Sequence, residues 1–296
     1  MWKGLIDMIR SGLSLMLEDE FLQAALPLFE CGSVEALEWS FDVGWSLPSL
    51  PEWVTALLRE YGEKGALVGH GVTFSALSGE WGDRAQNWSD QLREELNQRK
   101  YLHLSEHFGF MAGGNFHQGT PLPVPLTEKT LRLGQSRLKL LSDVAGAPVG
   151  LENLALALSP RDVADQGRFL GELLAPSDGF LVLDLHNIYC QMMNFDCTAD
   201  SILASYPLER VREMHISGGS WMEAVTARGT PIRRDTHDEA VPETVFQMLD
   251  AVLPRCPGTQ VVIFERLGHT LGGEGESETF RDDFLRMKSI VSSHAG

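Results

Sequence analysis

Residues 180–190 read FLVLDLHNIYC, an apolar run that ends in polar side chains. Asp184, His186 and Asn187 are residue types that can bind a metal or move a proton. Parallel strands that are buried on both faces have nearly continuous apolar sequences. In a barrel of such strands, the functional groups stand at the carboxyl ends. This stretch therefore predicts a buried parallel strand that leads into a functional site.

Seven other short apolar runs resemble this one, and helical patterns separate them. The eight runs are GLSLM (12–16), VEALEWSFD (34–42), ALVGHGVTF (66–74), YLHLSEHFGF (101–110), PVGLENLAL (148–156), FLVLDLHN (180–187), RVREMHISG (210–218) and QVVIFERLG (260–268). Helices are expected over 19–29, 51–65, 89–100, 128–146, 159–174, 199–206, 241–253 and 278–291. Ser159 and Pro160 suit a helix start, and Gly62 and Gly146 suit helix ends.

Eight strand–helix units in a chain of 296 residues predict a (β/α)8 TIM barrel, with residues 1–296 as a single domain. An open, doubly wound sheet is the alternative. It is less favoured because no glycine-rich phosphate loop follows the first strand.

The composition restricts the function. The net charge of −17 argues against binding to a nucleic-acid backbone or to anionic lipid. No window approaches the roughly 18 apolar residues of a membrane span. The start of the chain lacks the order of regions found in a signal peptide. The four cysteines are scattered and form no C-x-x-C pair. We therefore expect a cytoplasmic protein with reduced cysteines, and neither nucleic acid nor membrane as a partner.

Ionisable side chains recur where the expected strands end. Several carboxylates in one barrel mouth would repel each other, and bound cations would remove that cost. Imidazole and carboxylate ligands together suit Fe, Mn, Zn or Co. The candidates outnumber the ligands of one ion, which favours two or three metals. The nine candidate ligands are His70, His107, Glu152, Asp184, Asn187, His215, Asp235, His237 and Glu265.

Four other residues are expected near the site, either supporting the ligands or touching the substrate. His117 and His269 lie in loops on the functional face, and Glu106 and His186 adjoin candidate ligands. His103 should point to the opposite side of its strand from Glu106, and we expect it to be structural.

The order of several motifs resembles that of the DUF692 family, the multinuclear non-haem iron-dependent oxidative enzymes. This family includes the methanobactin-biosynthesis oxidase. The resemblance covers about residues 66–268. The motifs are HGVTFS (70–75), LSEHFGF (104–110), TPLPVPLT (120–127), LENLAL (151–156), LVLDLHNIY (181–189), RVREMHISGG (210–219), DTHDEAVPETVF (235–246) and IFERLG (263–268).

The resemblance implies a xylose-isomerase-like TIM barrel with two or three irons in mixed Fe(II)/Fe(III) states and dioxygen as co-substrate. The substrate would be a ribosomally made precursor peptide, modified at a cysteine. Its thiolate would bind iron, and hydrogen would be abstracted from the adjacent carbon. A small leader-binding protein would be a partner.

The same resemblance assigns ligands to each iron. Glu152 and Glu265 would be carboxylates of the central pair. His70 and His107 would serve one iron of this pair, and Asp184 and His215 the other. A third iron would take Asn187, Asp235 and His237. The resemblance also implies that many relatives have Asn at the position of His186, which leaves its role open between ligand and support, while Glu106 would ligate or orient His107.

Three other functions compete with this interpretation. A divalent-metal sugar isomerase or epimerase would use a similar set of carboxylates and histidines. A three-zinc barrel endonuclease would also do so, although the acidic composition argues against it. A non-catalytic metal-binding subunit is the remaining alternative.

Overall fold

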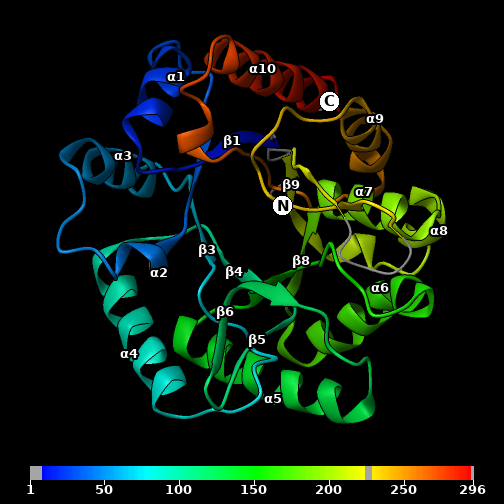
Figure 1. Ribbon diagram of the computed structural model, residues 1–296. Coiled ribbons are helices and arrows are strands. Elements are labelled where there is room, and N and C mark those ends of the chain that lie inside the picture. Colours follow the sequence, from blue (N-terminus) through cyan, green and yellow to red (C-terminus); the bar gives the residue numbers. More distant parts are fainter. Residues whose placement is uncertain (1–8, 224–228, 295–296) are drawn as a thin grey trace, which may run out of the picture.

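The computed structural model describes residues 9–223 and 229–294, except for the side chains of residues 117–119. Eight parallel strands close into a barrel, and helices surround it (Figure 1). Around the barrel the order is β1-β12-β9-β8-β7-β4-β3-β2. The strands are β1 (Arg10–Ser14), β2 (Ala36–Trp39), β3 (Leu67–Gly71), β4 (Leu104–His107), β7 (Val149–Glu152), β8 (Phe180–Asp184), β9 (Val211–Ser217) and β12 (Val261–Glu265). Each lies within a run that the sequence singles out, apart from the first residues of β1, and the predicted TIM barrel is confirmed.

Helices follow the strands and cover the outside of the barrel. They are α1 (Asp19–Glu30), α2 (Phe41–Gly44), α3 (Glu52–Glu63), α4 (Asp83–Gln98), α5 (Glu128–Ala145), α6 (Pro160–Leu174), α7 (Leu185–Phe195), α8 (Ala199–Leu203), α9 (Glu243–Val252) and α10 (Glu276–His294). Short 3-10 turns occupy Ala175–Ser177, Leu208–Arg210, Leu253–Arg255 and Gly268–Thr270.

Four residues were expected to start or end helices, and three of them do so in the structure. The Ser159 side chain accepts a hydrogen bond from the backbone N–H of Asp162, with Pro160 in the first turn. Gly146 ends α5 at a φ of 65°, a conformation that costs glycine little. Gly62 was expected to end its helix, but it lies inside α3. The left-handed position after α3 belongs to Gly65 instead.

The strands bury two different faces. Outward residues such as Leu37 and Phe264 pack against the helices, and the Phe264 ring lies 5.2 Å from that of Phe280 on α10. The floor of the barrel is a small apolar cluster of Ala36, Val68, Val261 and Ile263. Polar residues follow these toward the carboxyl ends of the strands, so the polar groups of the barrel interior lie above a closed apolar base.

The sixth strand is shorter than predicted. The sequence favours a strand over 180–187, but β8 ends at Asp184 and α7 begins at Leu185. The Asp184 side chain accepts a hydrogen bond from the backbone N–H of Asn187, and this N-cap starts the helix at once.

Two hairpins at the carboxyl ends of strands were also not predicted. One pairs β5 (Phe110–Gly113) with β6 (Phe116–Leu122), and the other pairs β10 (Trp221–Met222) with β11 (Ile232–Arg233). The β5–β6 hairpin lies over the barrel face that Figure 1 presents. Within residues 9–223 and 229–294, no helix has the length and apolarity that crossing a bilayer requires.

Candidate metal centre

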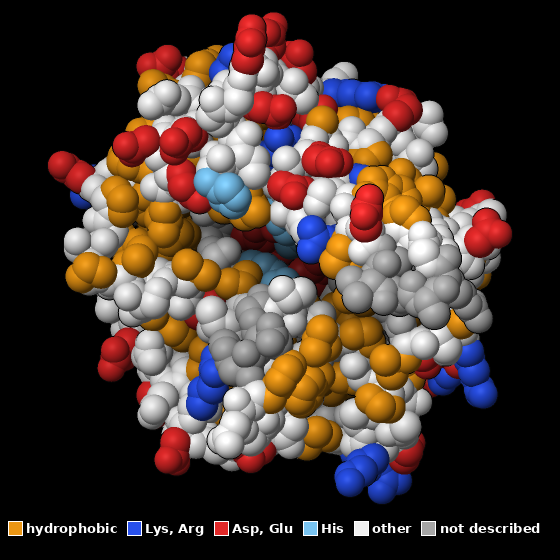
Figure 2. All heavy atoms as spheres, in the orientation of Figure 1, with side chains coloured by type: hydrophobic (Ala, Val, Ile, Leu, Met, Phe, Trp, Pro, Cys, Tyr) orange, Lys and Arg blue, Asp and Glu red, His pale blue; other side chains and the backbone are white. Residues whose placement is uncertain are grey.

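Six neighbouring barrel strands each carry an inward ionisable side chain at or near the carboxyl end. Because the strands are parallel and adjacent, these ends meet at one mouth. Figure 2 shows a hollow in this face, with acidic and histidine side chains at its base and hydrophobic ones on its rim. The residues are His70, His107, Glu152, Asp184, His215 and Glu265.

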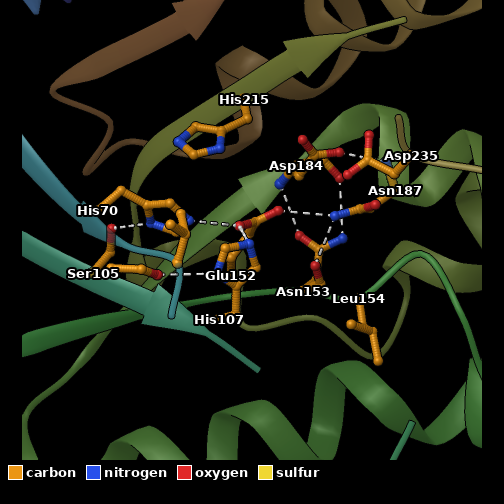
Figure 3. A network of polar contacts seen from close by, with 12 residues as sticks. His70, Ser105, His107, Glu152, Asn153, Leu154, Asp184, Asn187, His215 and Asp235 are labelled. Carbon is orange, nitrogen blue, oxygen red and sulfur yellow. Dashed lines mark hydrogen bonds and ion pairs between the residues drawn. The ribbon is translucent and has the colours of Figure 1, made fainter. Parts of the chain in front are cut away.

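Two imidazoles meet one carboxylate on the β3–β4–β7 side of the mouth. The Oε2 atom of Glu152 lies 3.1 Å from Nε2 of His70 and 3.4 Å from Nε2 of His107. The opposite nitrogen of each ring is held by the protein. Nδ1 of His70 lies 2.8 Å from Oγ of Ser105 (Figure 3), and Nδ1 of His107 lies 3.0 Å from the carbonyl oxygen of Gly71. Both rings therefore present Nε2 to the same point, as metal-binding histidines do.

Burial and charge act against each other in this group. Burial lowers the pKa of His70, but the hydrogen bond and charge of Glu152 and the charge of Glu38 raise it to about 9. For His107 burial prevails and lowers the pKa. Burial opposes ionisation of Glu152, yet the charges of His107 and His70 hold the pKa of this carboxyl below its usual range.

A second group joins Asp184, His215 and Glu265. Donor atoms of Glu152, Asp184 and His215 lie within 4.8 Å of one another, and Nδ1 of His215 lies 3.3 Å from Oε2 of Glu265. Burial raises the pKa of Asp184, and the charges of Asp235 and Glu152 raise it further. Such crowded carboxylates favour a cation between them.

A third group lies where α7 meets the loop after β11. The Oδ1 atom of Asp235 lies 2.8 Å from Nδ1 of His186 and 3.0 Å from Nε2 of His237. His237 has a φ of 52°, a strained conformation for a residue other than glycine, and functional sites often hold such strain. Burial lowers the pKa of His237, but the charges of Asp235 and Glu265 raise it well above its ordinary value.

Asn187 belongs to a different contact from its neighbour His186. Its Nδ2 donates one hydrogen bond to Oε1 of Glu152 and another to the carbonyl oxygen of Asn153, and each donor–acceptor distance is 2.9 Å (Figure 3). The structure thus brings Asn187 to Glu152 and brings His186 to Asp235. The family resemblance implied that Asn187 and Asp235 bind the same ion, and it left the role of His186 open.

The remaining expected residues lie outside these three groups. Glu106 is buried on the other side of β4 from His107, where a Cβ on Gly71 would clash with it. Burial and the charge of Asp42 raise the pKa of Glu106 well above its ordinary value. His269 is largely exposed and lies 3.8 Å from Glu18. His117 lies in β6, but its side chain falls outside the described part of the chain.

Three buried residues form a polar layer inside the barrel, below the mouth, and the sequence did not predict this layer. Glu38 and Glu213 were not singled out, because each lies within an apolar run. His103 points away from Glu106, as expected, and its Nε2 lies 2.8 Å from Oε2 of Glu213. The spacing of Glu213, two residues before His215, was the available signal, since alternate strand residues share a face.

The donor set fits metal ions. Several of these fully or nearly buried atoms have no hydrogen-bond partner in the described structure, which is costly unless another ligand satisfies them. Carboxylate oxygens and imidazole nitrogens are the ligands that Fe, Mn, Zn and Co share. The atoms without hydrogen bonds include Asp184 Oδ2 and Asn187 Oδ1, and also His215 Nδ1 and His237 Nε2, each of which lies only at ion-pair distance from a carboxylate.

A family model described as "RiPP precursor modification enzyme MbnB/TglH/ChrH" matches residues 50–269. The chain belongs to this family of enzymes that modify ribosomally made precursor peptides. This confirms the resemblance to the DUF692 family, which is also designated UPF0276.

Named relatives agree. A UPF0276 protein of Acinetobacter baylyi is 27% identical over 210 residues, covering 71% of this chain and 70% of the relative. A UPF0276 protein of Caulobacter vibrioides is 27% identical over 236 residues, covering 79% of this chain and 78% of the relative.

Solved structures support the fold alone, because their sequence identities are low. A D-psicose 3-epimerase of Clostridium cellulolyticum gives a TM-score of 0.56 at 10% identity, covering 96% of this chain and 99% of that one. Endonuclease IV of Thermus thermophilus gives 0.54 at 15% identity, covering 95% and 99%. A xylose isomerase domain containing protein of Salmonella typhimurium gives 0.56 at 15% identity, covering 99% and 100%.

Proposed function

We propose that this protein is an iron-dependent oxidase that uses dioxygen to modify a cysteine residue of a ribosomally made precursor peptide. The observation that carries the proposal is the presence of three adjoining carboxylate–imidazole groups at one barrel mouth. Membership of a RiPP-modifying family supports a peptide substrate, and the mixed nitrogen and oxygen donors support iron.

The contacts suggest which residues would hold each ion. His70, His107 and Glu152 would hold one, and Asp184, His215 and Glu265 would hold a second that shares Glu152. A third would take Asp235 and His237 with His186, the side chain that contacts Asp235, and Asn187 would orient Glu152. Bound iron would supply a Lewis acid for the substrate thiolate and electrons for dioxygen.

The chain's own residues would prepare and shield this chemistry. Ser105 and the Gly71 carbonyl fix the two rings beside Glu152, which leaves little reorganisation when an ion binds. Exposed hydrophobic side chains on the two hairpins offer a surface to a peptide, among them Phe116 and Trp221.

A small leader-binding partner protein would bring the precursor to the mouth. The reaction would take place in the cytoplasm, where Cys31, Cys190, Cys197 and Cys256 would remain free thiols, as they are in the structure.

The test is reconstitution of the metal-free protein with Fe(II) under argon, followed by addition of candidate peptides encoded beside the gene. A mass change that needs both dioxygen and the peptide cysteine would support the proposal, with a Cys-to-Ser peptide as the control. Sugar isomerisation under argon with Mn(II) or Co(II), and no oxygen-dependent peptide product, would instead favour an isomerase or epimerase.

A further inference from the structure

A buried layer of ionisable residues lies directly below the candidate metal centre. Glu38 is on β2, Glu213 is on β9, and His103 immediately precedes β4. Both glutamates are fully buried and His103 is 8% exposed. Glu213 stands two residues before His215 on the same strand, so its side chain enters the barrel one layer deeper. None of these three residues belongs to the proposed ligand sets.

The ring of His215 joins this layer to the mouth. Its Nε2 lies 3.1 Å from Oε2 of Glu38 and 3.4 Å from Oε1 of Glu213. Its Nδ1 lies 3.3 Å from Oε2 of Glu265 at the strand end. One nitrogen therefore faces the two deeper carboxylates, and the other faces a proposed ligand.

The buried carboxylate of Glu38 has the ring of His215 as its one partner among the described residues. Among the described residues it has no hydrogen bond, and its one ion pair is the contact with His215. A carboxylate that is 0% exposed is costly to bury without a partner. The oxygens of an ionised carboxylate can only accept hydrogen bonds, so the ring nitrogen facing them is favoured in its N–H form. A neutral imidazole carries one N–H, which leaves Nδ1 with a free lone pair.

We propose that Glu38 and Glu213 are positioning residues that hold His215 with Nε2 protonated and Nδ1 directed at the metal centre. This inference rests on the proposed function only in requiring a metal at Nδ1; it does not require iron or peptide oxidation. Histidines that bind metals commonly direct their other N–H at a carboxylate, which fixes the ring and raises its basicity.

The surroundings favour this role over a further metal site in the deeper layer. Glu213 already pairs with His103, whose Nε2 lies 2.8 Å from Oε2 of the carboxylate. Two imidazoles thus face the two carboxylates, and their N–H groups can serve both. Below them lies the apolar cluster that includes Ala36 and Val68, whose side chains offer no ligand atoms.

Zinc binding to the full-length, metal-free protein tests the proposal without iron or turnover. With histidine labelled in its ring nitrogens, long-range proton–nitrogen NMR of the zinc-loaded protein reports which nitrogen of His215 is bound. The expected result is zinc at Nδ1 and a proton on Nε2. Zinc at Nε2, or a His215 ring that binds no zinc, would overturn the proposal.

Variants provide the second readout. Glu38→Gln should lower the affinity for one zinc equivalent by about 10–100-fold in chelator competition, the range found for residues that orient ligands. Glu38→Asp should recover part of this loss, and the exposed Glu128→Gln should match wild type. Glu213→Gln should also weaken zinc and covers the case in which Glu38→Gln fails to fold.

Two results would contradict the positioning role. The first is wild-type zinc affinity in both glutamine variants, with only the unfolding free energy reduced. The second is loss of a whole zinc equivalent while His215 stays bound, since Glu38 would then be a ligand. Failure of the proposed function has a different signature: zinc would bind through Nδ1, but no peptide oxidation would be found with iron.

Discussion

The charge of Glu152 can be removed with little change of shape by Glu152→Gln. Glu152 touches His70, His107 and Asn187 at distances of 3.1, 3.4 and 2.9 Å. The glutamine can still accept from Asn187, but it cannot neutralise an imidazolium ring. The substitution should therefore act on the titration of His70 in the metal-free protein.

The magnitude follows from the pKa of His70. Its pKa is about 9, against an ordinary value of 6.5. A folded-state pKa above the unfolded value means that protonation stabilises the fold. This stabilisation is complete below pH 6.5 and is lost as the pH rises through about 9. It amounts to roughly 3 kcal/mol. Since the hydrogen bond and charge of Glu152 are two of the causes that raise this pKa, and the hydrogen bond is the largest of them, the variant should lose a substantial part of this pH-dependent stability, with roughly 3 kcal/mol as the upper limit.

The assay is urea unfolding of the chelator-treated proteins at pH 6.5 and pH 9, with NMR titration of the His70 ring beside it. Wild type should lose more unfolding free energy over this interval than Glu152→Gln does. The exposed Glu128→Gln is the matched control and should behave as wild type does. Equal pH dependence in Glu152→Gln and wild type would refute the reasoning, because the Glu152 charge would then not be what raises the pKa.

Three shorter predictions follow from the same structure. His186→Ala should weaken one metal equivalent more than about 10-fold, as measured by chelator competition, because it removes a contact of Asp235; unchanged affinity for every equivalent would exclude His186 from the centre. Burial, aided by the charge of Asp42, raises the pKa of Glu106, so its protonated form stabilises the fold below about pH 4.5 and this contribution is lost as the pH rises. Glu106→Gln should therefore gain stability relative to wild type as the pH rises from 4.5 to 8 in urea unfolding, and a constant difference would contradict a buried neutral carboxyl. A thiol reagent at pH 8 should label the exposed Cys31, whose pKa is lowered by a hydrogen bond with Ser33, well before the buried Cys190, whose pKa burial raises; mass spectrometry of the peptides checks the order.

The barrel could be predicted from sequence because its strands are buried on both faces. Runs such as 180–184 and 261–265 stay apolar until one ionisable residue ends them. That pattern gives both the strand and its functional end. The hairpin β5–β6 gave no comparable signal. Its residues Phe110–Leu122 combine glycines and polar residues, and the register of the two strands shifts between Phe110 and Ala112.

Most residues of the candidate site could be predicted because they lie at strand ends, but the contacts between them could not all be predicted. His70, His107 and Glu152 meet because β3, β4 and β7 are neighbours in the barrel. The separation of His186 from Asn187 depends on α7 beginning at Leu185, since adjacent residues on a helix point in different directions.

The role of Glu38 is a second feature that could not be predicted from the sequence. It lies in the short strand ALEW, where a single acidic residue between apolar neighbours resembles an ordinary break in a strand. Only the closed barrel places it 3.1 Å from His215, which is 177 positions later in the chain.

The central claim is that the barrel mouth is a multinuclear iron centre. Its most direct test is elemental mass spectrometry of anaerobically purified protein, with Mössbauer spectra of iron-57 material. The account predicts two or three irons per chain in mixed Fe(II)/Fe(III) states, and fewer in Glu152→Gln. Stoichiometric zinc or manganese without iron, or no bound metal after reconstitution with Fe(II), would contradict it.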